Sequence, residues 1–243
     1  MILGLFKAIF YEPLYNALVF LAVNVPGEDL GLAIILLTIA VRLVLFPLYH
    51  QSLKTQQKIK LVQPEIDKIK EEFKENKEEQ TKRILKLYQE NAINPFITFL
   101  VLLIQLPIIL SLFYVFRGSL TIDPTLLYSF IPAPDSIQHL FLGLFDVTAR
   151  SWPMAILVGA TQFLQMKLAV PPLPPRDLTK EANFKDDLMR SMHFQMRYFM
   201  PVVIVFVAVA LPSAISLYWI TSNLVSIAQE LIIRRTGLKL KTS

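Results

Sequence analysis

The sequence contains no cysteine, so a disulfide framework and a thiolate metal site are both excluded. The three histidines (His50, His139 and His193) are far apart in the chain, and neither an HExxH pattern nor a glycine-rich phosphate loop occurs. Glycine is also scarce, with 7 in 243 residues, which disfavours the broken helices of transporter binding sites. We therefore expect no enzyme, no cofactor and no metal centre.

Charged residues are also few. Charged residues make up 18% of the chain and apolar residues 54%, and the mean hydropathy is +0.50. Acidic residues are almost absent from the long apolar runs, so no intramembrane aspartyl pair or proton relay is expected. This composition is typical of a polytopic membrane protein.

Five apolar runs approach the roughly 20 residues that a helix needs to cross hydrocarbon. They predict an all-α membrane protein with five transmembrane helices. The stretch before them is interrupted by Lys7 and Glu12-Pro13, which favours an interfacial amphipathic helix over the alternative of a cleaved signal peptide. The expected segments are an N-terminal helix (1–29), a first span (30–50), a helical hairpin (51–94), a second span (95–117), an extracytoplasmic loop (118–151), a third span (152–169), a cytosolic loop (170–196), a fourth span (197–212), a fifth span (213–233) and a basic tail (234–243).

Lysine and arginine are concentrated in 51–94, in 170–196 and in the tail, whereas the other connections have few. The positive-inside rule then places these three segments in the cytosol. The N-terminus is expected outside and the C-terminus inside, which agrees with an odd number of spans.

Two connections carry more detailed expectations. In the hairpin, Pro64 suits the first turn of a helix, and a turn is expected near residues 74–77. A weak apolar stripe would join the two arms, although a plain solvated linker is the alternative. The stripe consists of Ile66, Ile69, Phe73, Ile84 and Leu87.

In the extracytoplasmic loop, a short interfacial helix is expected around 136–145.

Arg42 lies inside the apolar run 31–47. An arginine near the bilayer centre costs roughly 2.5–3.5 kcal/mol on insertion scales, and it does not lose its proton. Either a water-filled cavity solvates the guanidinium, or the side chain extends toward the headgroups.

Polar residues on other spans favour the cavity. Four spans carry such residues at helical spacing, and polar groups inside a membrane usually face the bundle interior. Interhelical hydrogen bonding, at about 0.6 kcal/mol per contact, is the alternative for any single residue. The expected polar lining of a groove around Arg42 is Thr38, Thr98, Gln105, Gln162, Gln165, Ser222, Ser226 and Gln229.

Four blocks of the chain resemble the YidC/Oxa/Alb family of membrane protein insertases in their order and spacing. The resemblance covers nearly the whole chain, and the polar residues of the blocks make it specific. It is to the short bacterial form, without the large periplasmic domain and the preceding signal anchor of Gram-negative relatives. The blocks are GLAIILLTIAVRLVLFPL (31–48), KLYQENAINPF (86–96), LLIQLPIILSLFYVF (102–116) and LPSAISLYWITSNLVSIAQELIIRR (211–235).

The resemblance implies five helices around a hydrophilic groove that opens to the cytosol and to lipid, with Arg42 facing into it. It implies an apolar slide for the inserting segment on the second and fourth spans, and a cytosolic hairpin (53–90) that receives substrate. The slide residues would be Leu102, Leu106, Ile109, Phe113, Phe199, Val203 and Phe206.

The function expected from the resemblance is insertion and folding of small membrane proteins in the plasma membrane of a bacterium. The partners would be nascent membrane proteins and the lipid bilayer, with the ribosome and a Sec translocon as further candidates. No small-molecule substrate is expected, and the chain is expected to be a monomer. The rival hypothesis is a small anion channel or transporter that uses Arg42 as its binding site.

Overall fold

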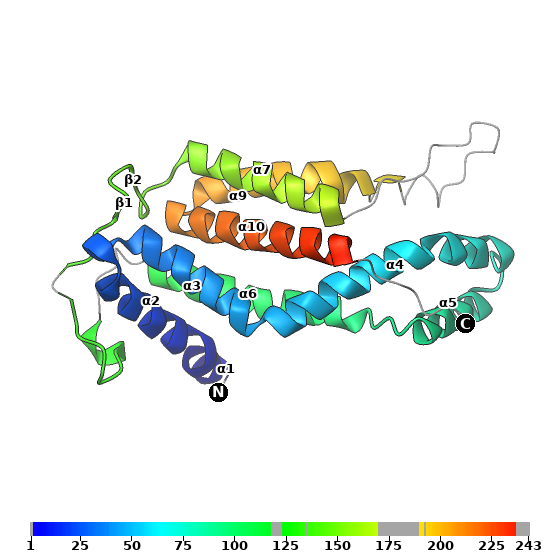
Figure 1. Ribbon diagram of the computed structural model, residues 1–243, viewed down its shortest axis with the longest axis horizontal. Coiled ribbons are helices and arrows are strands. Elements are labelled where there is room, and N and C mark those ends of the chain that lie inside the picture. The colour runs from blue at the N-terminus through cyan, green and yellow to red at the C-terminus, as the bar shows by residue number, and fades with distance from the viewer. Residues whose placement is uncertain (1, 118–122, 135, 170–189, 192, 237–243) are drawn as a thin grey trace. The chain divides into compact units, whose positions relative to one another are not determined.

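The computed structural model describes residues 2–117, 123–134, 136–169, 190–191 and 193–236. They are mostly helical, as expected for an all-α membrane protein (Figure 1). The chain divides into two compact units. The first unit comprises Met1–Val44 and Gln105–Ile227, and the second comprises Leu45–Ile104 and Ala228–Ser243.

The N-terminal helix is longer than the uninterrupted apolar run of the sequence. It consists of α1 (Ile2–Phe6), the π-helix η1 (Lys7–Tyr11) and α2 (Glu12–Asn24), so the helical backbone passes through Lys7 and Pro13. Proline is accommodated because it stands in the first turn of α2, where its missing N–H has no partner to lose. Its placement in the interface stays a prediction, because this helix is long enough to cross a membrane.

The short 3-10 helix η2 (Pro26–Glu28) leads into α3 (Leu30–Val44). Asp29 caps α3, because its carboxylate accepts a hydrogen bond from the backbone N–H of Leu32 at 3.0 Å. Leu45 then separates α3 from α4 (Phe46–Glu72), which belongs to the second unit.

Pro64 lies inside α4, so the prediction that a helix begins there is wrong. The helix begins at Phe46, with Pro47 in its first turn. An interior proline removes a backbone hydrogen bond and crowds the preceding turn. Burial of Val62 and Ile66 on either side of Pro64, 0% and 3% exposed, offsets this cost by holding α4 against α5.

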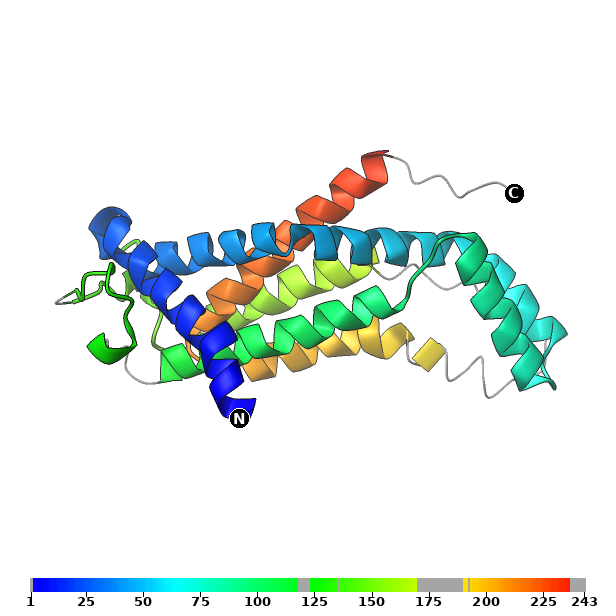
Figure 2. The same cartoon turned by 90° about the horizontal axis from the view of Figure 1, so that it is seen from below.

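The helix α5 (Lys77–Glu90) folds back along α4, and Figure 2 shows this hairpin in cyan and teal. Asn76 caps α5 by accepting a hydrogen bond from the N–H of Glu79 at 3.0 Å. The apolar stripe packs as expected, apart from Phe73, whose ring lies under the Arg83 guanidinium at 5.4 Å. The core of the hairpin consists of Val62, Ile66, Leu87 and Ile93, with Ile59, Ile69, Ile84 and Tyr88 around them.

The helix α6 (Phe96–Arg117) begins in the second unit and ends in the first, and the helix α10 (Ser213–Thr236) begins in the first and ends in the second. The first unit also contains α7 (Trp152–Ala169) and α9 (Met200–Ala210), the latter preceded by the π-helix η4 (Gln195–Phe199).

In the first unit α7, α9 and the start of α10 lie side by side (Figure 1). Small residues bring α7 and α9 together: Ala155 and Ala208 are buried, and a Cβ at Gly159 would overlap Val205.

The connection between α6 and α7 contains strands where a helix was expected. A 3-10 helix, η3 (Pro124–Leu126), is followed by a hairpin of β1 (Leu140–Phe141) and β2 (Phe145–Asp146). The prediction of an interfacial helix around 136–145 is therefore wrong. Leu142 and Gly143 have positive φ, 49° and 70°, which is incompatible with a right-handed helix.

Length and composition identify two described helices that could each cross a membrane, Gly4–Asn24 and Phe96–Phe116. A third is added if Leu30–Val44 and Phe46–Glu72 count as one span. Polar side chains lower the hydropathy of α10, and α9 is short, so five spans stay a prediction. The expected cytosolic loop and tail fall mostly on 170–189 and 237–243, which lie outside the described residues.

Candidate functional site

Arg42 is the buried cation of the first unit. It lies in the last turn of α3 and is 8% exposed. Its Nε donates to the Ser222 hydroxyl at 2.9 Å, and its Nη2 donates to the same oxygen. The guanidinium therefore turns toward α10, which disfavours the alternative that it extends along its own helix to the headgroups. One turn earlier, Thr38 is 1% exposed and donates to the carbonyl of Ile34.

The helix α10 supplies most of the polar side chains around this arginine. Ser222 and Ser226 are buried, and the Ser226 hydroxyl donates to the Ser222 carbonyl at 3.0 Å. Tyr218, one turn before Ser222, accepts a hydrogen bond from Gln105 of α6 at 2.6 Å. Asn223 donates to Thr161 of α7 at 3.1 Å. Polar contacts thus link α10 to α3, α6 and α7 within the first unit.

The structure brings together part of the predicted lining. In the first unit Thr38, Arg42, Ser222 and Ser226 are buried, and Gln105 is half-buried. Other predicted members lie elsewhere. Gln162 and Gln165 are half-buried on α7, where Thr161 is the residue that accepts a hydrogen bond from Asn223 of α10. Thr98 is exposed and Gln229 is buried, and both belong to the second unit.

Sequence reasoning missed Tyr218. A signal for it was present, because Tyr218, Ser222 and Ser226 follow one another at intervals of four residues. Extending the polar stripe by one turn toward the N-terminus would have found it.

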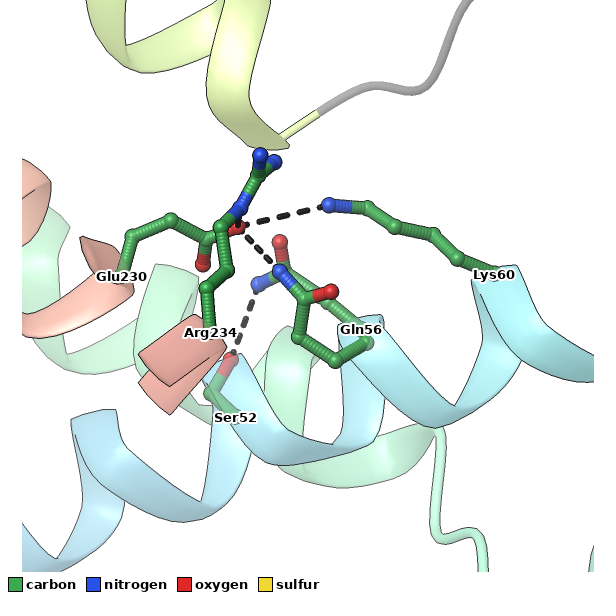
Figure 3. Close-up of polar contacts among 6 residues, drawn as sticks. Ser52, Gln56, Lys60, Glu230 and Arg234 are labelled. Atoms are coloured by element: carbon green, nitrogen blue, oxygen red, sulfur yellow. Dashed lines mark hydrogen bonds and ion pairs between the residues drawn. The ribbon is translucent and has the colours of Figure 1, made fainter. Parts of the chain in front are cut away.

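The second unit contains a buried carboxylate that sequence reasoning did not single out. Glu230 on α10 is 3% exposed. Figure 3 shows two of its contacts: Lys60 of α4 lies 3.4 Å from its Oε1, and Arg234 donates to that oxygen at 3.2 Å. Gln57 of α4 also donates to it. Burial lowers the pKa of Lys60, and the neighbouring Glu230 opposes this shift.

Two further side chains of α4 extend this polar cluster. Gln56 donates to the Ser52 hydroxyl at 3.3 Å, and Ser52 donates to Thr98 at 3.4 Å. Thr98 therefore belongs to a polar contact between α4 and α6 within the second unit.

The predicted slide residues leave much of their apolar surface uncovered. On α6, Leu102 and Leu106 are 54% and 51% exposed, and on η4 and α9, Phe199 and Phe206 are 51% and 64% exposed. Ile109, Phe113 and Val203 are half-buried. Both helices thus offer open apolar faces, while α10 carries the buried Ser222, Asn223 and Ser226.

Among the residues that the structure describes, no three His, Asp or Glu side chains are placed to hold a metal ion. The chemistry on offer is therefore that of a permanent positive charge, neutral hydroxyls and amides, and open apolar helix faces.

Comparison with known proteins identifies the family of the chain. Residues 21–240 match the family model described as 60Kd inner membrane protein. The chain is 31% identical over 207 residues to "Membrane protein insertase YidC" of Francisella tularensis subsp. novicida (strain U112), and equally so to that of subsp. tularensis (strain SCHU S4 / Schu 4). Each match covers 84% of this chain and 32% of the relative, so the chain spans about a third of the length of these curated relatives. The chain belongs to the 60Kd inner membrane protein family, the family of the YidC/Oxa insertases.

Proposed function

We propose that this protein inserts small membrane proteins into the lipid bilayer and helps them to fold, without nucleotide hydrolysis. Family membership supports the proposal, and so do the relatives, whose names describe a membrane protein insertase. The relatives are about three times as long as the matched region, since that region is 32% of their length, so the activity is proposed for this chain from its own residues.

The observation that carries the proposal is Arg42, a buried permanent charge bonded to Ser222 among the polar side chains of α10. Such a group is costly in hydrocarbon and is found where a membrane protein holds water or binds charge. In the proposed mechanism these residues line a groove that opens to the cytosol. The groove shortens the hydrocarbon barrier for a polar segment of the substrate, and Arg42 attracts the acidic residues of that segment.

The apolar helix of the substrate would meanwhile leave along α6 and α9 into lipid. The exposed faces of these helices, including Leu106 and Phe206, suit this role because they offer no charge to an apolar segment. Transfer from water to lipid supplies the driving force, at roughly 25 cal/mol per Å² of buried apolar surface. The membrane potential would assist acidic segments by about 2.3 kcal/mol per charge per 100 mV.

The proposed setting is the plasma membrane of a bacterium, with five spans, the N-terminus outside and the C-terminus in the cytosol. The lysines and arginines on the proposed cytosolic side support this orientation. Nascent membrane proteins are the proposed partners, with the ribosome and a Sec translocon as further ones, and a monomer is the proposed working form.

The decisive experiment uses the purified chain in liposomes and a small membrane protein whose translocated segment is acidic. Protease protection of that segment measures insertion, and a substrate with a neutral segment is the matched control. We expect insertion of both substrates, with Arg42→Ala reducing that of the acidic one by about tenfold, equivalent to 1.4 kcal/mol of lost attraction. Equal insertion of the two substrates by Arg42→Ala would show that the charge is not the attractant, and no insertion by the unmodified chain would refute the function itself.

Access to the groove can be measured separately, because the chain has no cysteine of its own. A single cysteine at the half-buried Gln105 should react with a membrane-impermeant thiol reagent supplied from the cytosolic side, whereas one at the exposed lipid-facing position Ile156 should not. Absence of reaction at Gln105→Cys would remove the aqueous groove. Anion flux through the same liposomes would instead favour the channel hypothesis.

A further inference from the structure

The β1–β2 hairpin carries an apolar surface that the proposed function does not use. Leu140, Leu142 and Leu144 are 44%, 58% and 76% exposed. The segment 139–145, HLFLGLF, contains no Asp, Glu, Lys or Arg. A connection that faces water on all sides normally places polar residues at such a tip, so these three leucines need an apolar surrounding.

The two faces of the hairpin differ. Phe141 and Phe145 pair across the strands, with ring centroids 5.4 Å apart, and both are half-buried. The Phe141 ring packs so closely on α3 that a Cβ at Gly31 would overlap it. The phenylalanines therefore supply the contact with the protein, and the leucines remain on the outside.

The hairpin is firmly fixed to the start of α3. Asp29 is 5% exposed, and its second carboxylate oxygen accepts a hydrogen bond from the N–H of Leu142 at 2.6 Å. Gln138 and residues 28–30 exchange backbone hydrogen bonds: the N–H of Leu30 donates to Gln138 at 2.9 Å, and the N–H of Gln138 donates to Glu28 at 3.1 Å. The leucines are thus held in place on the outside.

The turn adds an independent observation. Leu142 has a φ of 49°, a left-handed conformation that is sterically unfavourable for leucine and usual for glycine, asparagine or aspartate. Gly143 occupies the next such position, with a φ of 70°. A large apolar side chain at Leu142 contributes nothing to the turn itself, which points to a use for its exposed surface.

The position of the hairpin within the first unit indicates what covers the three leucines. It adjoins the start of α3, and the chain after β2 runs directly into α7. The same stretch receives the start of α10, because Ser213 and Ala214 donate backbone hydrogen bonds to Ala149 and Val147 at 2.9 and 2.7 Å. Three helices of the bundle thus begin at this level, and Trp152, 58% exposed in the first turn of α7, is the residue type enriched where spans meet the headgroups.

We propose that Leu140, Leu142 and Leu144 enter the lipid interface at the end of the bundle where α3, α7 and α10 begin. The occupant of this surface is the headgroup and upper acyl region of the outer leaflet. The adjoining helix α7 also carries an open apolar face, because Trp152 and Ile156, one turn apart, are both 58% exposed. The inference rests on the membrane placement proposed above and not on the insertase activity.

The test uses single cysteines carrying an environment-sensitive fluorophore on the protein reconstituted in liposomes. Leu144→Cys reports the tip, Ser136→Cys reports an exposed polar position of the same connection, and Leu110→Cys, 48% exposed on α6, reports a transmembrane helix. The quenchers are a lipid with a nitroxide near the headgroup and aqueous iodide.

We expect the ratio of lipid quenching to iodide quenching to be at least threefold higher at Leu144→Cys than at Ser136→Cys, with a blue-shifted emission at the tip. Equal ratios at the two positions would place the tip in water and overturn the proposal. Protection of Leu144→Cys from both quenchers would mean that protein covers the leucines, which also overturns it.

Leu110→Cys separates the two proposals. If lipid quenches Leu110→Cys but not Leu144→Cys, the proposal that the hairpin tip enters the lipid interface is wrong, and the membrane placement of the helices stands. If lipid quenches neither, both fail. Insertase activity is not measured, so its loss or retention does not affect the result.

Discussion

Two buried charges, one in each unit, are held in different ways. Arg42 of the first unit donates two hydrogen bonds to the hydroxyl of Ser222. Glu230 of the second unit receives the ammonium of Lys60, the guanidinium of Arg234 and the amide of Gln57. The bonds to Ser222 orient the Arg42 guanidinium toward α10, whereas the ion pairs of Glu230 cancel most of the field of its carboxylate.

The charge of Arg42 is proposed to act on a substrate, whereas that of Glu230 stabilises the fold. Loss of Glu230 should destabilise the protein, because Lys60 would remain buried beside Arg234. It should therefore reduce the insertion of every substrate to the same extent. Loss of Arg42 should instead change insertion according to the charge of the translocated segment. Variants at both charges, and at the residues that hold them, test this distinction.

Glu230→Ala should lower the free energy of unfolding by about 3 kcal/mol, the lower end for breaking a buried ion pair, because the Arg234 side chain is 44% exposed. Denaturant unfolding in detergent micelles measures the loss. The control is Glu90→Ala, whose side chain is 58% exposed beside Lys86 and should contribute less than about 0.5 kcal/mol. Comparable losses at both positions would contradict a structural role for the Glu230 cluster.

Ile66→Ala should destabilise the α4–α5 hairpin by about 2 kcal/mol, because it leaves a cavity in a core where Ile66 is 3% exposed. Hydrogen exchange of the α5 amides should accelerate by about 30-fold, the equivalent of that loss. Leu61→Ala, on the same helix and 46% exposed, is the control and should change exchange little. An unchanged exchange rate in Ile66→Ala would mean that the hairpin opens without breaking this core.

Ser222→Ala should cost about 1.5 kcal/mol, the value of a hydrogen bond to a charged group, because it removes a hydroxyl that accepts from Arg42. Thermal unfolding measures the difference. Ser226→Ala is the matched control on the same face of α10, because the Ser226 hydroxyl donates to a carbonyl of its own helix. Its loss should lower the free energy of unfolding by only a few tenths of a kcal/mol. If the two variants lose the same stability, the bond between α3 and α10 is not what Ser222 contributes.

Arg42→Lys should reduce insertion of an acidic substrate by about threefold, or roughly 0.7 kcal/mol. Lysine keeps the charge but cannot reproduce the two-nitrogen contact with Ser222. The liposome insertion assay with acidic and neutral segments measures the effect, with Arg42→Gln as the uncharged comparison. A lysine variant no better than the glutamine variant would show that geometry, not charge, is required.

The periodicity of the sequence was sufficient to predict several helices and part of the site around Arg42. The apolar runs predicted helices close to α6, α7 and α10, because helix formation depends on neighbours within a turn or two. The spacing of Ser222 and Ser226 identified the polar face of α10 for the same reason. Arg42 could be singled out because a charged residue inside a long apolar run is visible in the sequence itself.

Only the tertiary structure decided which residues meet. The partner of Arg42 is 180 residues away, and Glu230 meets Gln57 and Lys60 across 173 and 170 residues. No local pattern encodes such pairs, because they depend on how helices pack. Pro64 was misread for the same reason, since the α4–α5 core outweighs its local cost. The prediction of a helix in place of the β1–β2 hairpin was wrong because the hairpin is held by Asp29 and Gly31, which lie more than 100 residues earlier.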